Sequence, residues 1–231
     1  MTPEIVSRSF TNDSAVFDSV FFNNIYKLKG NKDKSSVGKI IVDIGAHAGF
    51  FSFLALNLGA RKVYSFEPYI DNFNVLLKNC YNPHFVGRIT PYQLGVNTET
   101  GTSLFDPPQL VDGMYFDLAG VKIAIDNQDG KYACPCQTLD EILRIQCFNE
   151  KIDVLKINIG YAEREILLTS FLLSSNVNSI CGEITANDAQ LDDFKFQLGK
   201  KGFVNFFSEP PTEEERVLFR CSQGNLSDNF I

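Results

Sequence analysis

Short apolar runs alternate with glycine-containing turns and amphipathic stretches along most of this chain. Residues 40–42 are β-branched with no polar break, a pattern typical of a strand buried on both faces of a parallel sheet. The glycine-rich turn that follows leads into residues 50–58, which predict a helix, and residues 63–66 predict the next strand. This succession of strand, turn, helix and strand predicts an α/β fold.

The same reasoning predicts elements along the rest of the chain. Apolar residues at helical spacing predict an amphipathic helix over 14–28, and Thr138 to Glu141 has the spacing of a helix-capping box. The loop between the last two expected strands is too short for a crossover helix, so those strands should pair antiparallel. Expected strands lie at 89–94, 103–105, 121–125, 132–136, 152–159, 179–184, 203–207 and 216–220. Expected helices lie at 71–80 (with Asp71 as N-cap), 162–173 and 188–200.

Acidic residues end two expected strands on either side of the glycine turn. Asp43 precedes Gly45 and Gly49 in the pattern D-x-G-x-x-x-G, and Glu67 follows the second strand, 24 residues after Asp43. A dinucleotide fingerprint has a middle glycine and binds a pyrophosphate, which Asp43 would repel. Asp43 can instead orient an ammonium group, and Glu67 can hold a ribose diol. The combination favours S-adenosylmethionine, which has both groups and no phosphate, over a glycine turn that only packs tightly.

Composition narrows the class of protein. The 231 residues, 44% of them hydrophobic and 21% charged, suit one α/β domain. The net charge is −7 and lysine and arginine form no run, which argues against a nucleic acid as partner. No apolar stretch approaches the roughly 20 residues that span a bilayer, and no signal-peptide pattern is present, so we expect a cytoplasmic protein. The six cysteines contain no C-x-x-C pair, which favours reduced thiols and disfavours a zinc site.

Five segments follow one another in the order of a known family. The turn DIGAHAG at 43–49 resembles motif I of class I methyltransferases. The segment YSFEP at 64–68, with Asn72 and Asn79 after it, resembles the FEP-x-x-x-N…N segment of FkbM-type methyltransferases. Residues 137–141 (QTLDE) resemble their T-L-D-E box, 153–163 resemble their D-x-L-K-I-D-x-E-G-x-E segment, and 181–183 resemble their fifth strand. The resemblance spans roughly 17–202, most of the chain.

The resemblance implies a Rossmann-like class I methyltransferase fold, in which a seven-stranded, mostly parallel sheet of order 3-2-1-4-5-7-6 has helices on both faces. It implies one methyltransferase domain over 1–231, with an N-terminal helical segment at 1–38 and a core at 39–231. Residues 106–132 are a candidate insertion that binds the acceptor, because long loops in compact domains are often functional. The implied cofactor is S-adenosylmethionine, with S-adenosylhomocysteine as product and no divalent metal. The residues expected at the cofactor are Asp43, Gly45, Ala46, His47, Gly49, Phe50, Phe51, Glu67, Pro68, Asn72, Gly95, Val96 and Asn158.

The resemblance breaks at the fourth expected strand. The family pattern has Asp and Glu where this chain has Asn158 and Gly160, and the family's glycine falls on Tyr161. Asn158 can form hydrogen bonds with the methionine end of the cofactor or with the substrate, but it is not a strong base. It is also a poorer ligand for a hard divalent cation. If relatives use those acids in the reaction, this chain either proceeds differently or has lost the activity.

Four side chains are candidates for the catalytic step. Methyl transfer to a hydroxyl depends on positioning the acceptor oxygen and is helped by a base within hydrogen-bond reach. Glu183 is the first candidate for that base or for binding the acceptor hydroxyl, although capping the following turn explains it equally well. His47 is a candidate base or a pocket-lining residue, and Lys156 with Asn158 is the third candidate. Lys156 lies on a buried strand and needs a partner, which Glu163 or Glu183 would provide without any catalytic role.

These inferences lead to a leading hypothesis and three alternatives. The leading hypothesis is an S-adenosylmethionine-dependent O-methyltransferase that acts on a hydroxyl of a sugar or glycan, to which the acids and aromatics of 106–132 are suited. One alternative is a methyltransferase-like module that binds the cofactor but is catalytically impaired. Another is a methyltransferase that acts on a non-carbohydrate small molecule. An NAD-dependent oxidoreductase is disfavoured by the missing middle glycine. Nothing in the pattern specifies an oligomeric state.

Overall fold

The computed structural model describes residues 5–9, 11–28, 38–105, 109–111, 114–116, 132–160, 162–210, 212 and 215–224. The expected strand at 121–125, the acidic residues Asp112 and Asp117, and Tyr161 lie outside the described residues.

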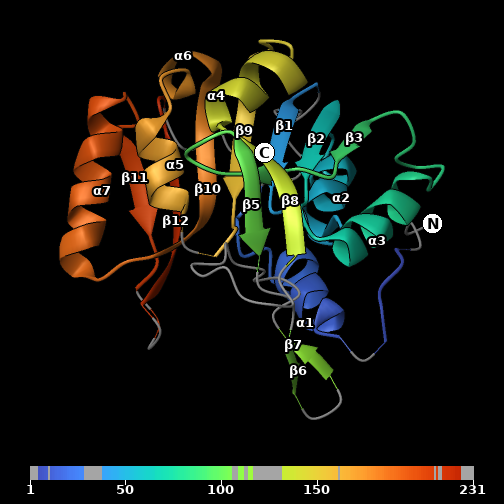
Figure 1. Cartoon of the computed structure of the whole chain (residues 1–231). Coiled ribbons are helices and arrows are strands. Elements are labelled where there is room, and N and C mark those ends of the chain that lie inside the picture. Colours follow the sequence, from blue (N-terminus) through green and yellow to red (C-terminus); the bar gives the residue numbers. More distant parts are fainter. Residues whose placement is uncertain are drawn as a thin grey trace.

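A seven-stranded sheet of order β11-β12-β10-β9-β1-β2-β3 forms the centre of the molecule (Figure 1). Its strands are β1 (Ile40–Ile44), β2 (Lys62–Phe66), β3 (Ile89–Tyr92), β9 (Ile152–Ile157), β10 (Val177–Thr185), β11 (Asn205–Ser208) and β12 (Arg216–Ser222). Only β12 runs antiparallel to its neighbours, β10 and β11. Counted along these seven strands, the order is 3-2-1-4-5-7-6, so the predicted sheet and its antiparallel final pair are confirmed.

Strand register brings the candidate residues together at the middle of the sheet. β1 lies between β2 and β9, and within it Asp43 pairs with Ser65 on one side and Lys156 on the other. Directly paired residues of parallel strands present their side chains on the same face. The backbone alone therefore makes Asp43 and Lys156 neighbours, a contact between residues 113 positions apart in the sequence.

Two apolar clusters occupy the two faces of the sheet. On one face, alternate residues of β1 and β9 pack with α2 (Phe50–Asn57), α3 (Ile70–Cys80) and the N-terminal segment, which contains α1 (Asp13–Phe17) and η1 (Asp18–Phe22). On the other face, the intervening residues pack with α4 (Leu139–Glu141), η3 (Ile142–Gln146), α5 (Glu163–Thr169), α6 (Leu173–Asn176) and α7 (Asp188–Lys200). Helices thus cover both faces, as expected.

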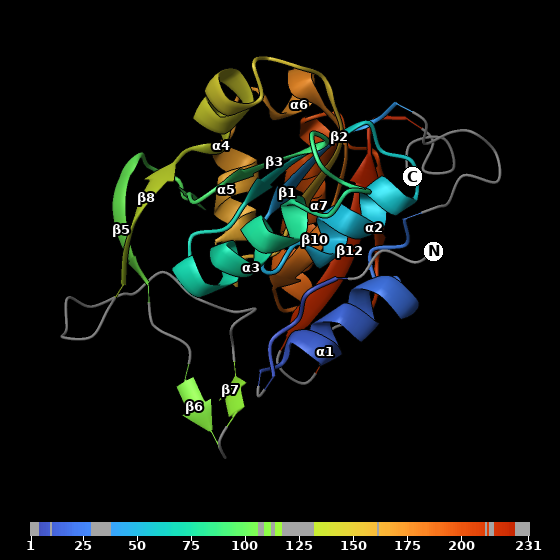
Figure 2. The same ribbon diagram turned by 90° about the vertical axis from the view of Figure 1, so that its right-hand side faces the viewer.

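Shorter strands form two smaller sheets outside the central one. β4 (Gly95–Val96), β8 (Tyr132–Gln137) and β5 (Gly101–Phe105) form a three-stranded sheet, and β6 (Gln109–Val111) pairs with β7 (Met114–Phe116). Figure 2 shows β5 and β8 at one side of the molecule, away from the sheet, with β6 and β7 below them. The strands expected at 103–105 and 132–136 are therefore confirmed.

Three local predictions were wrong. The first helix ends at Phe22 because the chain turns at Asn24, whose φ is +45°, so the expected helix over 14–28 is shorter. The helix expected over 162–173 ends at Thr169, where Ser170 is extended, and a second helix begins only at Leu173. Asp71 is not the N-cap of α3: the cap position is Tyr69, and Asp71 lies within the first turn. The capping box at Thr138 and Glu141 is confirmed.

Among the residues that the structure describes, no helix is both long and apolar enough to span a bilayer.

Candidate functional site

The glycine turn between β1 and α2 is held tightly between the two neighbouring strands. Gly45 has a φ of +74°, and a Cβ atom at this position would lie 2.0 Å from the backbone oxygen of Asn158 at the end of β9. On the other side, the backbone N–H groups of Gly45 and Ala46 both donate to the carbonyl of Phe66, each at 3.0 Å. Only glycine fits at this close approach, which fixes the turn at the carboxyl edge of the sheet.

A buried ion pair lies behind the turn. The carboxylate of Asp43 is fully buried, and its Oδ1 lies 3.0 Å from Nζ of Lys156. Lys156 also donates to the carbonyls of Gly45 at 2.6 Å and Ile44 at 3.2 Å. Ser52 donates to Oδ2 of Asp43 at 2.7 Å. Burial alone would lower the pKa of Lys156, but Asp43 and other nearby groups outweigh it and raise the pKa, so the ammonium stays charged.

This ion pair contradicts the expected partners of Lys156 and changes the expected role of Asp43. The predicted partners of Lys156, Glu163 and Glu183, are wrong, because its partner is Asp43. Glu163 instead accepts hydrogen bonds from the backbone N–H groups of Ile159 at 2.7 Å and Gly160 at 2.6 Å. Asp43 faces Lys156 and Ser52, so in this arrangement it supports the turn through Lys156.

Glu67 lies at the tip of β2 and organises the residues around it. Its Oε2 accepts from the backbone N–H of His47 at 2.8 Å, and its Oε1 accepts from Tyr69 at 3.0 Å and from the Asn72 amide at 3.2 Å. The residue is only 4% exposed. Burial raises the pKa of Glu67 to about 7, against the opposing effect of these hydrogen bonds.

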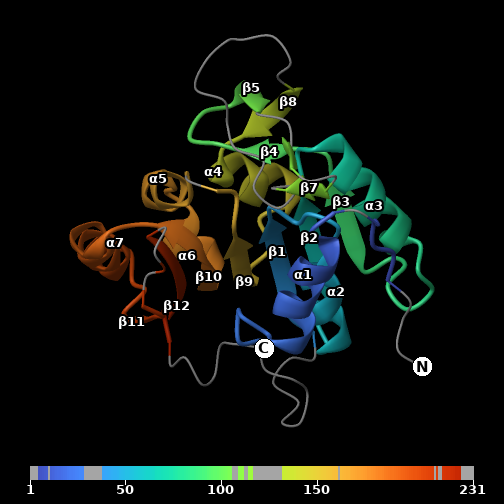
Figure 3. The same cartoon turned by 90° about the horizontal axis from the view of Figure 1, so that it is seen from below.

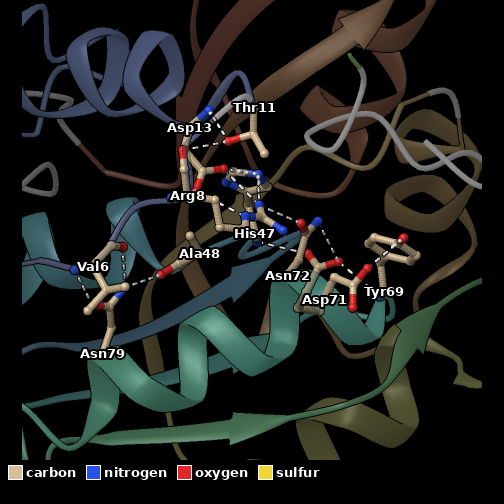
Figure 4. A network of polar contacts seen from close by, with 11 residues as sticks. Val6, Arg8, Thr11, Asp13, His47, Ala48, Tyr69, Asp71, Asn72 and Asn79 are labelled. Carbon is tan, nitrogen blue, oxygen red and sulfur yellow. Dashed lines mark hydrogen bonds and ion pairs between the residues drawn. The ribbon is translucent and has the colours of Figure 1, made fainter. Parts of the chain in front are cut away.

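A polar network around Arg8 joins the N-terminal segment to His47 and Asn72 (Figure 4). Arg8 donates to the fully buried Asp13 through Nε at 3.1 Å and Nη2 at 2.7 Å. The same Nη2 lies 2.9 Å from Oδ1 of Asn72 and 3.2 Å from Nε2 of His47. Burial alone would raise the pKa of Asp13, but hydrogen bonds from Arg8 outweigh it and lower the pKa. Burial lowers the pKa of His47 to about 3, so its ring is neutral.

A small cavity lies between the glycine turn, the end of β9 and the N-terminal segment. Its volume is about 50 Å³, which is room for about four water-sized groups. The cavity is lined by Val16, Val20, Tyr26, Gly45, Ala46, His47, Phe50, Phe51, Lys156 and Asn158. The structure therefore brings together the expected residues of the turn, of the start of α2 and of β9.

Other expected site residues lie beside the cavity or away from it. Gly49 ends the turn, and Glu67 and Asn72 are joined to the cavity wall through His47. The carbonyl of Pro68 accepts a hydrogen bond from Tyr132. Gly95 and Val96 are buried in β4, where they pair with β8. Glu183 lies on β10 and forms an ion pair with Arg216, outside the residues that line the cavity.

The sequence reasoning missed the wall that the N-terminal segment supplies. Val20 and Tyr26 fall within the amphipathic helix predicted over 14–28, and no sequence pattern points to Arg8. The helical spacing was the available signal, but it cannot tell which part of the sheet a helix covers. Figure 3 shows α1 in front of β1 and α2, where the segment packs against the turn.

The chemical groups in and beside the cavity match those that S-adenosylmethionine needs. The close approach at Gly45 and the carboxylate of Glu67 are both present, and Nδ1 of His47 is buried with no hydrogen-bond partner among the described residues. A polar group of a ligand in the cavity would satisfy that nitrogen. At about 50 Å³, the cavity has room for only a fragment of such a ligand. Within the described ranges, no group of three or more His, Cys, Asp or Glu residues is arranged to hold a metal ion.

Comparisons with known proteins agree with this geometry. The family model described as the methyltransferase FkbM domain matches residues 43–207. No curated protein sequence matches the chain significantly.

Several solved structures share the fold at low sequence identity. The methyltransferase FkbM from Methylobacillus flagellatus has 16% identity and a TM-score of 0.57, over 89% of this chain and 47% of that chain. TrmK from M. capricolum, solved with S-adenosyl-homocysteine, has 12% identity and a TM-score of 0.51, over 88% of this chain and 67% of that one. The fibrillarin pre-rRNA processing protein from Methanococcus jannaschii has 15% identity and a TM-score of 0.53, over 97% and 84%. The chain thus spans about half the length of the Methylobacillus protein.

Proposed function

This chain belongs to the FkbM methyltransferase family, a family that uses S-adenosylmethionine, and we propose that it methylates a hydroxyl group of a sugar or glycan. When bound, S-adenosylmethionine supplies a methyl group activated by its sulfonium. The acceptor oxygen would take this methyl group as the carbon–sulfur bond breaks, which leaves S-adenosylhomocysteine, and the hydroxyl proton would pass to water.

The observation that carries the proposal is the cavity at the glycine turn, with Glu67 joined to its wall. The turn admits a close approach to the backbone because Gly45 has no side chain. In this proposal Glu67 would accept hydrogen bonds from a ribose diol. Phe50 and Phe51 supply apolar walls of the cavity.

The site has no strong base among its four candidate catalytic residues. Lys156 is charged and Glu183 is paired with Arg216. Asn158 is an amide, and the neutral ring of His47 is a weak base because burial lowers its pKa to about 3. The chain's contribution to the reaction would therefore come from orienting the acceptor oxygen, which is the larger part of many group-transfer accelerations.

The sugar or glycan acceptor is supported by the family resemblance and by the residues of 106–132, whose carboxylates and aromatic rings suit hydroxyl groups and sugar faces. A test would incubate the purified protein with S-adenosylmethionine labelled in the methyl group and a panel of glycans, glycosides, phenols and RNA. Release of S-adenosylhomocysteine with sugar-containing acceptors alone, and label on a sugar oxygen, is the expected result. Transfer to a phenol or to RNA would contradict the sugar assignment.

A second candidate function is a module that binds the cofactor without catalysis. Asn158 and the lack of a strong base favour it. Calorimetry separates the two functions, because the module would bind S-adenosylhomocysteine yet give no turnover with any acceptor. A protein that binds neither S-adenosylmethionine nor its product would contradict both.

A further inference from the structure

The N-terminal segment supplies one wall of the cavity, although it precedes the residues that the family model matches. Val16, Val20 and Tyr26 line the cavity opposite the glycine turn. Of these three side chains, Tyr26 is the one with a polar group. It is 3% exposed and belongs to the apolar cluster that also contains Phe51.

Tyr26 is held in place by a compact turn. The side-chain amide of Asn24 donates to the carbonyl of Leu28 at 2.6 Å, and its oxygen accepts from the Leu28 N–H at 2.9 Å. The N–H of Lys27 donates to the carbonyl of Asn24 at 2.8 Å. The Tyr26 ring packs edge-on against Phe51, with 5.3 Å between ring centroids. The hydroxyl is therefore presented to the cavity from a fixed position.

The Tyr26 hydroxyl is an unused hydrogen-bond donor among the described residues. It accepts a hydrogen bond from Nδ2 of Asn158 at 3.0 Å, and no acceptor for its own proton lies among the described residues. Lys156 is already engaged: it donates to the carbonyls of Gly45 and Ile44, and its Nζ forms an ion pair with Oδ1 of Asp43 at 3.0 Å. Of these two residues, Tyr26 is the donor that remains available to a ligand.

We propose that Tyr26 is a positioning and specificity residue whose hydroxyl donates a hydrogen bond to the carboxylate at the amino-acid end of S-adenosylmethionine. The inference rests on the proposed function, because it assigns one end of that cofactor to the cavity. A carboxylate needs donors, and a cavity of about 50 Å³ accommodates a group of that size.

The residue at position 158 fits the same assignment. The family pattern has Asp there, and a carboxylate would take the Tyr26 proton for itself and repel a second carboxylate. Asn158 instead donates to Tyr26 and leaves the hydroxyl proton for the ligand.

The test compares two ligands by calorimetry. S-adenosylhomocysteine has the amino-acid end, and 5′-methylthioadenosine lacks it but keeps the nucleoside and the sulfur. Tyr26→Phe removes only the hydroxyl and is expected to lower the affinity for S-adenosylhomocysteine about tenfold or more, as expected for a hydrogen bond to a charged group. The affinity for 5′-methylthioadenosine should stay within twofold of wild type.

Asn158→Asp provides an independent variant in case Tyr26→Phe folds poorly. It should also weaken S-adenosylhomocysteine selectively. The matched control is Tyr64→Phe, which removes a hydroxyl that contacts Lys62 and Glu150 and lies outside the cavity lining. This control should leave both affinities unchanged.

Two results separate the failure of this inference from the failure of the proposed function. If the wild type binds both ligands and Tyr26→Phe and Asn158→Asp leave the S-adenosylhomocysteine affinity unchanged, or weaken both ligands equally, the role of Tyr26 is refuted and the cofactor assignment stands. If the wild type binds neither ligand, the proposed function is refuted together with this inference.

Discussion

Replacing Lys156 by methionine tests whether the buried ion pair holds the site together. Methionine keeps most of the side-chain volume but leaves the carboxylate of Asp43 buried without its cation. The variant also removes the hydrogen bonds to the carbonyls of Gly45 and Ile44. The side chains of Lys156 and Asp43 are 6% and 0% exposed, so water cannot replace the lost contacts.

The expected loss in the free energy of unfolding is about 4 kcal/mol, because removing one partner of a buried pair typically costs about 3–5 kcal/mol. That loss is a large fraction of the total stability of an ordinary domain. Adding Asp43→Asn to Lys156→Met removes the stranded charge, and this double variant should recover at least 2 kcal/mol or so relative to Lys156→Met alone.

The assay is urea unfolding followed by circular dichroism, at fixed pH and salt. The matched control is Lys62→Met on β2, where the lysine is 31% exposed and lies 3.8 Å from Glu150. This partly exposed pair should cost less than about 1 kcal/mol. If Lys156→Met costs no more than Lys62→Met, or if Asp43→Asn gives no recovery, the ion pair is not what holds the turn.

Three further changes test other parts of the site. The pKa of Glu67 is raised to about 7 in the fold, so between about pH 4.5 and 7 the native state holds a proton that the unfolded chain has released. The free energy of unfolding should therefore fall by about 3 kcal/mol as the pH rises through that window. Urea unfolding of Glu67→Gln at several pH values should show no such fall. Gly45→Ala places a Cβ 2.0 Å from the oxygen of Asn158 and should weaken S-adenosylhomocysteine binding at least tenfold in calorimetry, whereas Gly199→Ala, which meets nothing within 4 Å, should leave binding unchanged. Arg8→Ala removes the side chain at the centre of the N-terminal network. The variant should increase the rate of hydrogen exchange over 12–28 and the rate at which S-adenosylhomocysteine associates in stopped-flow. Unchanged rates would mean that the N-terminal segment does not limit entry of the ligand into the cavity.

The sheet could be predicted because its strands carry their own signal. The run at 40–42 is apolar without interruption, and the later strand at 152–157 is apolar except for Asp153 and Lys156. The short loop before Arg216 leaves only an antiparallel pairing. Asp43 and Glu67 could be placed at strand ends for the same reason. Strand positions and strand ends depend mainly on residues close together in the chain, so they can be predicted from one sequence.

The contacts that complete the site depend on register and on packing between distant segments. Lys156 faces Asp43 because β1 and β9 pair in one particular register, which the pattern of either strand does not specify. The helix over 162–173 is interrupted at Ser170, where Asp140 accepts hydrogen bonds from the N–H groups of Phe171 and Leu172. The sequence around Ser170 does not indicate that Asp140, 30 positions earlier in the chain, is its partner.

The wall contributed by Val16, Val20 and Tyr26 has a consequence for how relatives of this protein can diverge. The turn, Glu67 and β9 lie within the matched region, 43–207, while this wall precedes it. A change of side chain in the wall alters the shape and polarity of the cavity without altering the strands that support the turn. Two proteins with the same core could therefore bind different ligands, and grafting residues 12–28 from one to the other would be a direct way to transfer that preference.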